Sequence, residues 1–179
     1  MLVLLDRDGV LNQHRDDYVK SPAELVMLPG AAEAVARLNG AGHRVVVCTN
    51  QSAVGRGVIP PAMLERIHDS LREHLARAGA GLDALLVCTD PPWAATDRRK
   101  PGPGMLQEAM RQFRIAPHDS VMIGDDLVDL QAAARAGIRR ILVQSGKGRR
   151  TQAAGIPPDV LPVAVHADLA AAVASLLGP

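Results

Sequence analysis

Two aspartates just past an apolar run are the residues best placed to do chemistry. Residues 2–5 (Leu-Val-Leu-Leu) have the pattern of a buried strand, and Asp6 and Asp8 follow it with Arg7 between them. Side chains alternate along a strand, so the two carboxylates leave it on one side, with α-carbons about 6–7 Å apart. That spacing suits a tetrahedral group held between a nucleophile and an acid/base. Taken alone, the same residues are also typical of an acidic turn after a strand.

The composition is that of one ordinary globular domain. The 179 residues are 47% hydrophobic and 22% charged, with a formal net charge of +1, which is ample material for a core. So small a charge does not favour nucleic acid or an anionic membrane surface. Tyr18, Trp93 and Phe113 are the only three of the Phe, Trp and Tyr type, too few for base stacking. We therefore expect a single domain over residues 1–179, with no nucleic-acid partner and no membrane partner.

Cysteine use and the start of the chain bear on the cellular compartment. Cys48 and Cys88 are the only cysteines and both end apolar runs, which does not suggest a secreted disulfide framework. No basic segment with a following apolar stretch precedes the first strand, and no apolar window is long enough for a membrane span. These features predict a cytoplasmic protein, and we expect it to act as a monomer.

Short apolar runs alternate with helical patterns along the chain. Strands are expected at 2–6, 44–49, 84–88, 120–124 and 139–143, with a weaker one at 162–166. Helices are expected at 30–40, 61–78, 103–114, 126–136 and 167–177. The alternation predicts an α/β fold with βαβ units, a mostly parallel central sheet and right-handed crossovers.

Polar clusters follow the predicted strands, where ligands bind in open parallel sheets. Strand 44–49 runs into Thr49-Asn50-Gln51-Ser52, and strand 120–124 runs into Gly124-Asp125-Asp126. The segment Arg98-Arg99-Lys100-Pro101 lies beyond strand 84–88. We therefore expect these clusters and the first aspartates to meet at one edge of the sheet.

This order of clusters resembles the haloacid dehalogenase superfamily of phosphohydrolases. Asp6-Arg7-Asp8-Gly9-Val10 is similar to its first motif, Thr49-Asn50 to its second and Lys100 to its third. Gly124-Asp125-Asp126, with Asp129 following, is similar to the fourth. The resemblance implies a Rossmann-like three-layer sandwich. The βα units use most of the intervals between motifs, so we expect a capless enzyme with an open site.

The resemblance also implies a catalytic role for each motif residue. Asp6 would attack phosphorus and form an aspartyl-phosphate. Asp8 would protonate the leaving oxygen and then activate the water that hydrolyses the intermediate. Thr49 would hydrogen-bond the phosphoryl oxygens, and Lys100 would neutralise them as a compact charge.

A Mg²⁺ ion is the cofactor that the resemblance implies. Asp6, the backbone carbonyl of Asp8, and Asp125 would hold it, with waters and substrate completing the octahedron. Without a metal, these carboxylates would repel an anionic phosphate. Asp126 and Asp129 are left open, since either could orient the metal's waters or cap the helix that starts near residue 126.

Further strings narrow the resemblance to a branch that contains heptose-bisphosphate and histidinol-phosphate phosphatases. They are Tyr18-Val19, Gly55-Arg56-Gly57, Arg99-Lys100-Pro101 and Gly102-Pro103-Gly104-Met105. The branch implies a small phosphorylated sugar as substrate, preferably a heptose 1,7-bisphosphate that loses its C7 phosphate during lipopolysaccharide precursor synthesis. The substrate-binding residues that it implies are Arg15, Asp16, Asp17, Tyr18, Asn50, Gln51, Ser52, Arg99 and Asp126.

One loop departs from this branch, many of whose members bind a structural zinc through three cysteines and a histidine. Cys88 is present, but Asp90, Thr96 and Arg98 stand where a histidine and two cysteines are expected. One thiolate, one carboxylate and two groups that do not bind zinc make no closed zinc site. We therefore expect no structural zinc, and a loop ordered by its prolines and Trp93.

Other functions remain compatible with the sequence. The nearest are hydrolysis of histidinol phosphate or of a broad range of phosphate esters, since a capless site is open. A non-catalytic phosphosugar-binding protein is the alternative of another class, although a binder needs neither a nucleophile nor a separate acid. Among residues outside the motifs, His68 and His74 are expected on the solvated face of helix 61–78. Arg56 is expected in a turn with some substrate contact.

Overall fold

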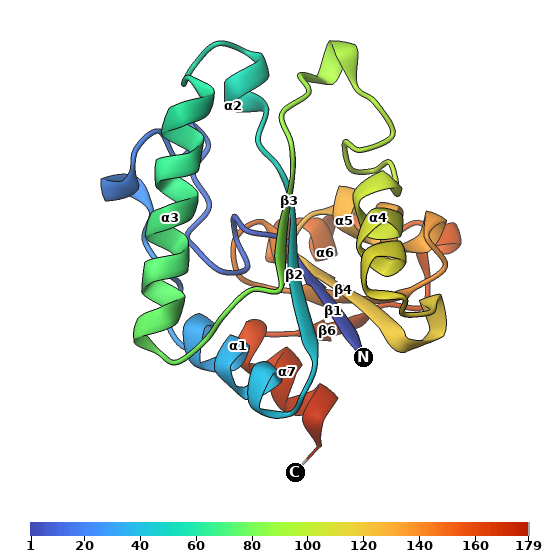
Figure 1. Cartoon of the computed structure of the whole chain (residues 1–179). Helices are drawn as coiled ribbons and strands as arrows, with labels where there is room; N and C mark the ends of the chain where they lie inside the picture. The colour runs from blue at the N-terminus through green and yellow to red at the C-terminus, as the bar shows by residue number, and fades with distance from the viewer. Residues whose placement is uncertain (179) are drawn as a thin grey trace.

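A six-stranded sheet, parallel in every strand pair, forms the centre of the computed structural model, which describes residues 1–178 (Figure 1). The strand order is β3-β2-β1-β4-β5-β6, the order of a Rossmann-like sheet. The strands are β1 (Leu2–Leu5), β2 (Arg44–Asn50), β3 (Ala84–Cys88), β4 (Ser120–Gly124), β5 (Arg139–Val143) and β6 (Ala164–His166). The predicted mostly parallel sheet is therefore confirmed, including its weak sixth strand.

Helices cover both faces of the sheet, which makes three layers (Figure 1). The first helical layer consists of α1 (Ala31–Gly40), α3 (Pro61–Arg77) and α7 (Leu169–Leu177). The second contains α4 (Gly104–Phe113) and α5 (Leu127–Arg135). Two shorter helices, α2 (Ser52–Gly55) and α6 (Gly148–Ala154), were not predicted. Helices this short bury too small a face to show a period in the sequence.

Strand β1 is apolar along its whole length because helices cover both of its faces. Leu2 and Leu4 pack with the α4–α5 layer, whereas Val3 and Leu5 pack with the α1–α3–α7 layer, and all four are fully buried. A strand covered on both faces has no solvated side for polar residues. The central strand therefore carries its first polar side chain only where it leaves the sheet, at Asp6.

Helix α3 has the ends that the sequence predicts. It begins at Pro61 after Pro60 and ends at Arg77, and Gly79 follows with a left-handed φ of 71°. Proline suits the first helical turn, and glycine adopts the left-handed conformation after the last one. The helix is therefore fixed at both ends by the local sequence.

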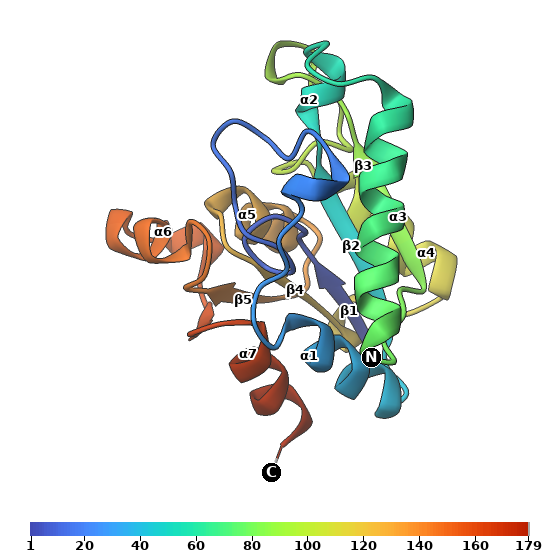
Figure 2. The same cartoon turned by 90° about the vertical axis from the view of Figure 1, so that its left-hand side faces the viewer.

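Short 3₁₀ turns complete the loops. They are η1 (Pro22–Glu24), η2 (Pro92–Ala94), η3 (Pro117–Asp119) and η4 (Pro158–Val160), each of which begins at a proline. The segment between β1 and α1 passes over the carboxyl ends of the strands (Figure 2), and within residues 1–178 no inserted cap domain covers them. No described helix has the length and apolar character of a membrane span.

Candidate active site

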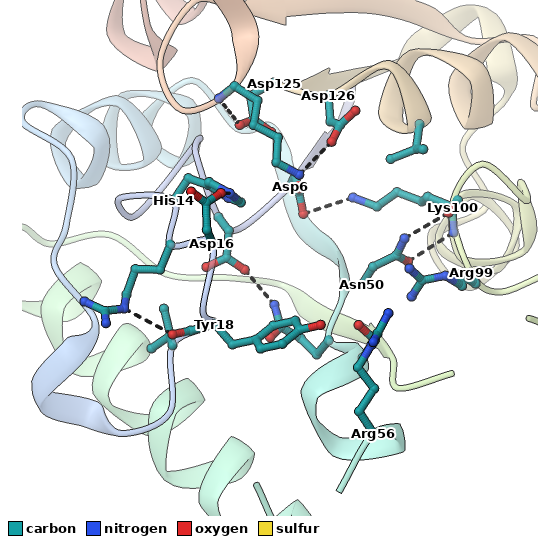
Figure 3. Close-up of a pocket in the computed structure, with 17 residues that line it drawn as sticks. Asp6, His14, Asp16, Tyr18, Asn50, Arg56, Arg99, Lys100, Asp125 and Asp126 are labelled. Carbon is teal, nitrogen blue, oxygen red and sulfur yellow. Dashed lines mark hydrogen bonds and ion pairs between the residues drawn. The ribbon is translucent and has the colours of Figure 1, made fainter. Parts of the chain in front are cut away.

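The carboxyl ends of the central strands open into a cavity of about 350 Å³. Figure 3 shows its side chains converging from the loops after β1, β2, β3 and β4. The residues predicted from the sequence that line it are Asp6, Asp8, Arg15, Asp16, Tyr18, Asn50, Gln51, Ser52, Arg99, Lys100, Asp125 and Asp126. The polar clusters that the sequence placed at one edge of the sheet therefore share one cavity.

Lys100 lies at the floor of this cavity between two carboxylates. Its Nζ is 2.9 Å from Asp6 Oδ1 and 2.6 Å from Asp129 Oδ1. Burial disfavours the charged amine, but the carboxylates of Asp129 and Asp6 outweigh that effect and raise the pKa of Lys100. The amine therefore stays charged, although its residue is only 2% exposed.

Three carboxylates lie close together at this end of the cavity, and two of them, Asp6 and Asp129, pair with Lys100. Asp6, Asp125 and Asp129 each place an oxygen within 4.8 Å of the others. Burial, and then the charges of Asp129 and Asp6, raise the pKa of Asp125 to about 8. Oxygen ligands of this kind suit a hard divalent cation such as Mg²⁺, whose charge would offset the repulsion. The chemistry of the donor set therefore fits the predicted metal at Asp6 and Asp125.

The carboxylate of Asp8 accepts hydrogen bonds from side chains that make no hydrogen bond to Asp6, Asp125 or Asp129. Arg7 Nη2 and Asn12 Nδ2 donate to its Oδ1, each at 2.9 Å, and Gln51 Nε2 donates to its Oδ2 at 2.7 Å. Burial alone would raise the pKa of Asp8, but the positive charge of Arg7 and these donors lower it. Asp6 and Asp8 thus leave the same strand in different environments, one beside Lys100 and the other beside Arg7.

His68 is buried, so its expected place on a solvated face is wrong. Its imidazole Nε2 is 3.2 Å from Arg7 Nη1, and the residue is fully buried. It falls on the buried stripe of α3, with Leu64, Leu71 and Leu75, at the spacing of one helical face. That spacing was the signal in the sequence that the prediction for His68 overlooked.

Thr49 and Asn50 support the site from the end of β2. Thr49 Oγ1 accepts a hydrogen bond from Gln51 Nε2 at 2.9 Å, and Thr49 does not line the cavity because it is 1% exposed. Asn50 exchanges two hydrogen bonds with the backbone of Lys100, at 2.9 and 3.0 Å. The amide of Asn50 therefore fixes the loop that carries Lys100, a task that residue type alone could not reveal.

The loop from His14 to Lys20 forms one wall, and one predicted member lies outside the cavity. The carboxylate of Asp17 pairs with Arg15 and Lys20 and does not line the cavity, so its predicted contact with substrate is not supported by its position. Tyr18 does line it and has a left-handed φ of 67°, which is unusual for a residue with a side chain. Figure 3 shows its ring extending toward Arg56.

Cationic side chains form the opposite wall. Arg99 lines the cavity, and its Nη1 donates to the carbonyl oxygen of Asp90 at 2.9 Å. Arg56 also lines it, with its guanidinium carbon 5.0 Å from the centre of the Trp93 ring, a cation–π arrangement. Lys147 also lines the cavity. The sequence placed the Gly146-Lys147-Gly148 loop near the site but did not assign Lys147 a role, because the segment lacks a complete phosphate-loop spacing.

The residues at the expected zinc positions are engaged with one another. Asp90 accepts hydrogen bonds from the backbone and hydroxyl of Thr96, at 2.8 and 2.5 Å. Arg98 pairs with Glu108 on α4 and donates to a backbone carbonyl of β3. These bonds describe how a loop of this composition is ordered, and the absence of a structural zinc stays a prediction.

Asp126 and Asp129 cap α5, one of the two roles left open. The two residues form a capping box in which the Asp126 N–H donates to Asp129 Oδ2 at 3.0 Å. Lys147 Nζ is 2.9 Å from Asp126 Oδ2, and although burial opposes ionisation, this contact lowers the pKa of Asp126. One short turn thus aims Asp129 at Lys100 and keeps Asp126 at the cavity wall.

Comparisons with known proteins identify the family to which the chain is similar. A family model described as "HAD-hyrolase-like" matches residues 97–172. A D-glycero-beta-D-manno-heptose-1,7-bisphosphate 7-phosphatase of Bordetella bronchiseptica is 44% identical over 98% of this chain and 97% of its own length. A protein of the same name from Pseudomonas putida is 40% identical over 98% of this chain and 99% of its own.

Similar solved structures include two heptose-bisphosphate phosphatases. The D,D-heptose 1,7-bisphosphate phosphatase of B. bronchiseptica, complexed with magnesium and phosphate, has a TM-score of 0.93 at 44% identity and covers 98% of this chain and 97% of its own. The corresponding phosphatase of Burkholderia thailandensis has a TM-score of 0.77 at 41% identity, with 99% of both chains covered. The fold and these relatives identify the chain as a phosphoric monoester hydrolase. The chain belongs to the haloacid dehalogenase-like family.

Gly124, at the end of β4, leaves room for the carboxylate that pairs with Lys100. A Cβ there would lie 2.3 Å from Asp129 Cβ. We expect Gly124→Ala to lower the free energy of unfolding by about 1–3 kcal/mol, as overpacking does, whereas a Cβ at Gly81 meets no atom within 4 Å. Urea unfolding of both variants checks this, and equal stability of Gly124→Ala and Gly81→Ala would contradict the crowding.

The neutral state of His68 makes stability depend on pH. Burial, and then the charge of Arg7, lower its pKa from 6.5 to about 3. The unfolded chain therefore takes up a proton below about pH 6.5 that the native protein does not, and native stability falls by up to about 1.4 kcal/mol per pH unit toward pH 3. Above pH 6.5 the ring is neutral in both the folded and the unfolded protein, so the stability lost at lower pH is fully present there.

Urea unfolding at pH 7 and pH 5 measures that loss. The parent should lose more stability between the two values than His68→Gln, which has no group that titrates there. A difference between parent and variant that stays constant from pH 7 to pH 5 would show that His68 does not titrate as its burial requires.

Proposed function

We propose that this enzyme removes the C7 phosphate of D-glycero-D-manno-heptose 1,7-bisphosphate, a step in the supply of nucleotide-activated heptose for lipopolysaccharide. The observation that carries the substrate is the full-length similarity to phosphatases of that name. The cavity supports it, since Lys100 lies at the acidic end while Arg56 and Arg99 line the wall. A bisphosphate has a second anionic group for such cations to bind.

Asp6 is the proposed nucleophile. Its Oδ1 accepts from the Arg7 N–H at 2.8 Å and pairs with Lys100 at 2.9 Å. These contacts leave Oδ2 to attack phosphorus, and the ester P–O bond breaks as the aspartyl-phosphate forms. Lys100 offsets the charge of the phosphoryl oxygens during this step.

Asp8 is the proposed acid and base. It would give a proton to the departing ester oxygen and later take one from the water that attacks the aspartyl-phosphate. Gln51 Nε2 bonds both Asp8 Oδ2, at 2.7 Å, and Thr49 Oγ1, at 2.9 Å. A movement of this one amide would therefore free both the Asp8 carboxylate and the Thr49 hydroxyl from Gln51, and we retain Thr49 as a phosphoryl ligand on that condition.

The loop residues would orient the sugar. Arg15, Asp16 and Tyr18 would contact it from one side, and Ser52 and Asn50 from the end of β2. Asp126 lines the same cavity. Mg²⁺, held by Asp6, Asp125 and the backbone carbonyl of Asp8, would supply Lewis-acid stabilisation of the phosphoryl charge.

A panel of esters tests the proposed substrate. Phosphate release should be fastest from one anomer of heptose 1,7-bisphosphate, ahead of fructose 1,6-bisphosphate, histidinol phosphate and an aryl phosphate. Arg99→Gln should lower kcat/KM for the bisphosphate by at least about tenfold, the effect of losing a charged hydrogen bond, and leave the aryl ester unaffected. Similar turnover of all the esters would retain the chemistry and remove the heptose assignment.

The two aspartates of the first motif are tested by amide replacements. Asp6→Asn should abolish turnover, because the amide does not displace the ester oxygen. Asp8→Asn should lower turnover of a sugar phosphate by about 10²–10⁴-fold, the usual contribution of general acid/base catalysis. Asp69→Asn, at an exposed position on α3, is the matched control. Activity of Asp8→Asn within a few-fold of the parent would rule out its acid/base role.

The proposed metal-binding role of Asp6 and Asp125 is tested by removing and restoring the metal. We expect EDTA to stop phosphate release and Mg²⁺ to restore it, and Mg²⁺ to raise the thermal unfolding midpoint, since ligands that bind the native state stabilise it. Asp125→Asn should lose most of that thermal shift. Restoration by zinc alone, or a shift that survives in Asp125→Asn, would place the metal elsewhere.

A further inference from the structure

Arg7 connects the proposed acid/base to His68 on helix α3. Its side chain is fully buried, with Nη2 donating to Asp8 Oδ1 at 2.9 Å and Nη1 lying 3.2 Å from His68 Nε2. A guanidinium keeps its proton and has no acceptor atom. The Nε2 of His68 must therefore accept this hydrogen bond, which places the ring proton on Nδ1 and leaves the ring neutral.

The two contacts fix the plane of the guanidinium. Arginine presents its N–H groups in a rigid fork, so an acceptor at each terminal nitrogen sets the orientation of the whole group. The Nε of Arg7 has no hydrogen-bond partner within residues 1–178. The orientation of the fork therefore depends on Asp8 at one tip and His68 at the other.

Asp8 depends on the same fork in turn. Arg7 Nη2 lies 2.9 Å from both carboxylate oxygens of Asp8. Asn12 donates to Oδ1, and Gln51, a residue of the cavity lining, donates to Oδ2. The guanidinium therefore grips the whole carboxylate, and the contact with Gln51 marks Oδ2 as the oxygen on the cavity side. Without the acceptor at His68, the buried Nη1 of Arg7 would have no hydrogen-bond partner. The guanidinium would then reorient and move Asp8, to which it is hydrogen-bonded.

We propose that His68 is a positioning residue for the acid/base step, acting through Arg7 to hold Asp8 Oδ2 toward the ester oxygen. The inference rests on the acid/base role proposed for Asp8. His68 itself touches no reacting atom, and Arg7 carries its effect.

The chemistry of the first step supplies a specific readout. As Asp6 attacks, the ester P–O bond breaks, its electron pair stays on the leaving oxygen, and the proton of Asp8 moves to that oxygen. An alkyl alkoxide leaves poorly without this proton, whereas a nitrophenolate leaves without it. A misplaced Asp8 should therefore slow alkyl esters selectively, and kcat/KM reports this step because it covers events up to formation of the aspartyl-phosphate.

The test compares His68→Leu with the parent on heptose 1,7-bisphosphate and on p-nitrophenyl phosphate. We expect kcat/KM to fall about 10–100-fold on the sugar ester, the range found when an orienting residue is removed, and to change little on the aryl ester. His68→Gln, which keeps an acceptor for Arg7, should recover most of the loss. His74→Leu, on the same helix with its Nδ1 bonded to Ser70, should match the parent.

Equal losses on both esters, or no loss on either, would overturn the proposal. Should His68→Leu not fold, Arg7→Lys replaces it, because lysine keeps the buried charge but does not bridge both partners, and the same contrast between esters is required. If Asp8→Asn also retains full activity on the sugar ester, the acid/base role itself fails. If the His68 variants lose activity equally on both esters while Asp8→Asn is impaired on the sugar ester, the role of His68 is overturned and the acid/base role of Asp8 stands.

Discussion

The crowding of like charges at the end of the central strands governs the rest of the site. Asp6, Asp125 and Asp129 bring three carboxylates within 4.8 Å of one another, beside one buried lysine. Such a group is costly to assemble unless opposite charge and hydrogen bonds compensate it. The amide clamp of Asn50 on the Lys100 backbone supplies part of that compensation by fixing the cation where it is needed.

The topology of the sheet makes this assembly feasible. β1 lies between β2 and β4, so Asp6 and Asp125 leave adjacent parallel strands on the same edge. The Asp6 N–H continues the ladder by donating to the carbonyl of Ile123 at 3.0 Å. The capping box of α5 then orients Asp129 toward the same point. Main-chain geometry thus sets the positions of the acids before any loop contributes.

Much of this could be predicted from the sequence, and the limits have physical causes. Asp6 and Asp125 were predictable because each directly follows a buried strand whose direction sets the position of the side chain. Thr49 and Asp17 were harder, because the availability of a side chain depends on its partners. Gln51 donates a hydrogen bond to the Thr49 hydroxyl, and Arg15 and Lys20 pair with Asp17. Composition does not encode such pairings.

Contacts between distant parts of the chain complete the site. Ser145 Oγ donates to the carbonyl of Gly9 at 2.7 Å, and the Lys147 N–H donates to Asp125 Oδ2 at 2.7 Å. A Cβ on Gly146 would lie 2.5 Å from Gly9 Cα, so the two loops touch backbone to backbone. During synthesis from the N-terminus, Asp6 is among the first residues to emerge, yet its surroundings form only after β5 and the turn beyond it have been made. A nascent chain therefore carries its reactive aspartate without an assembled site until most of the polypeptide has left the ribosome.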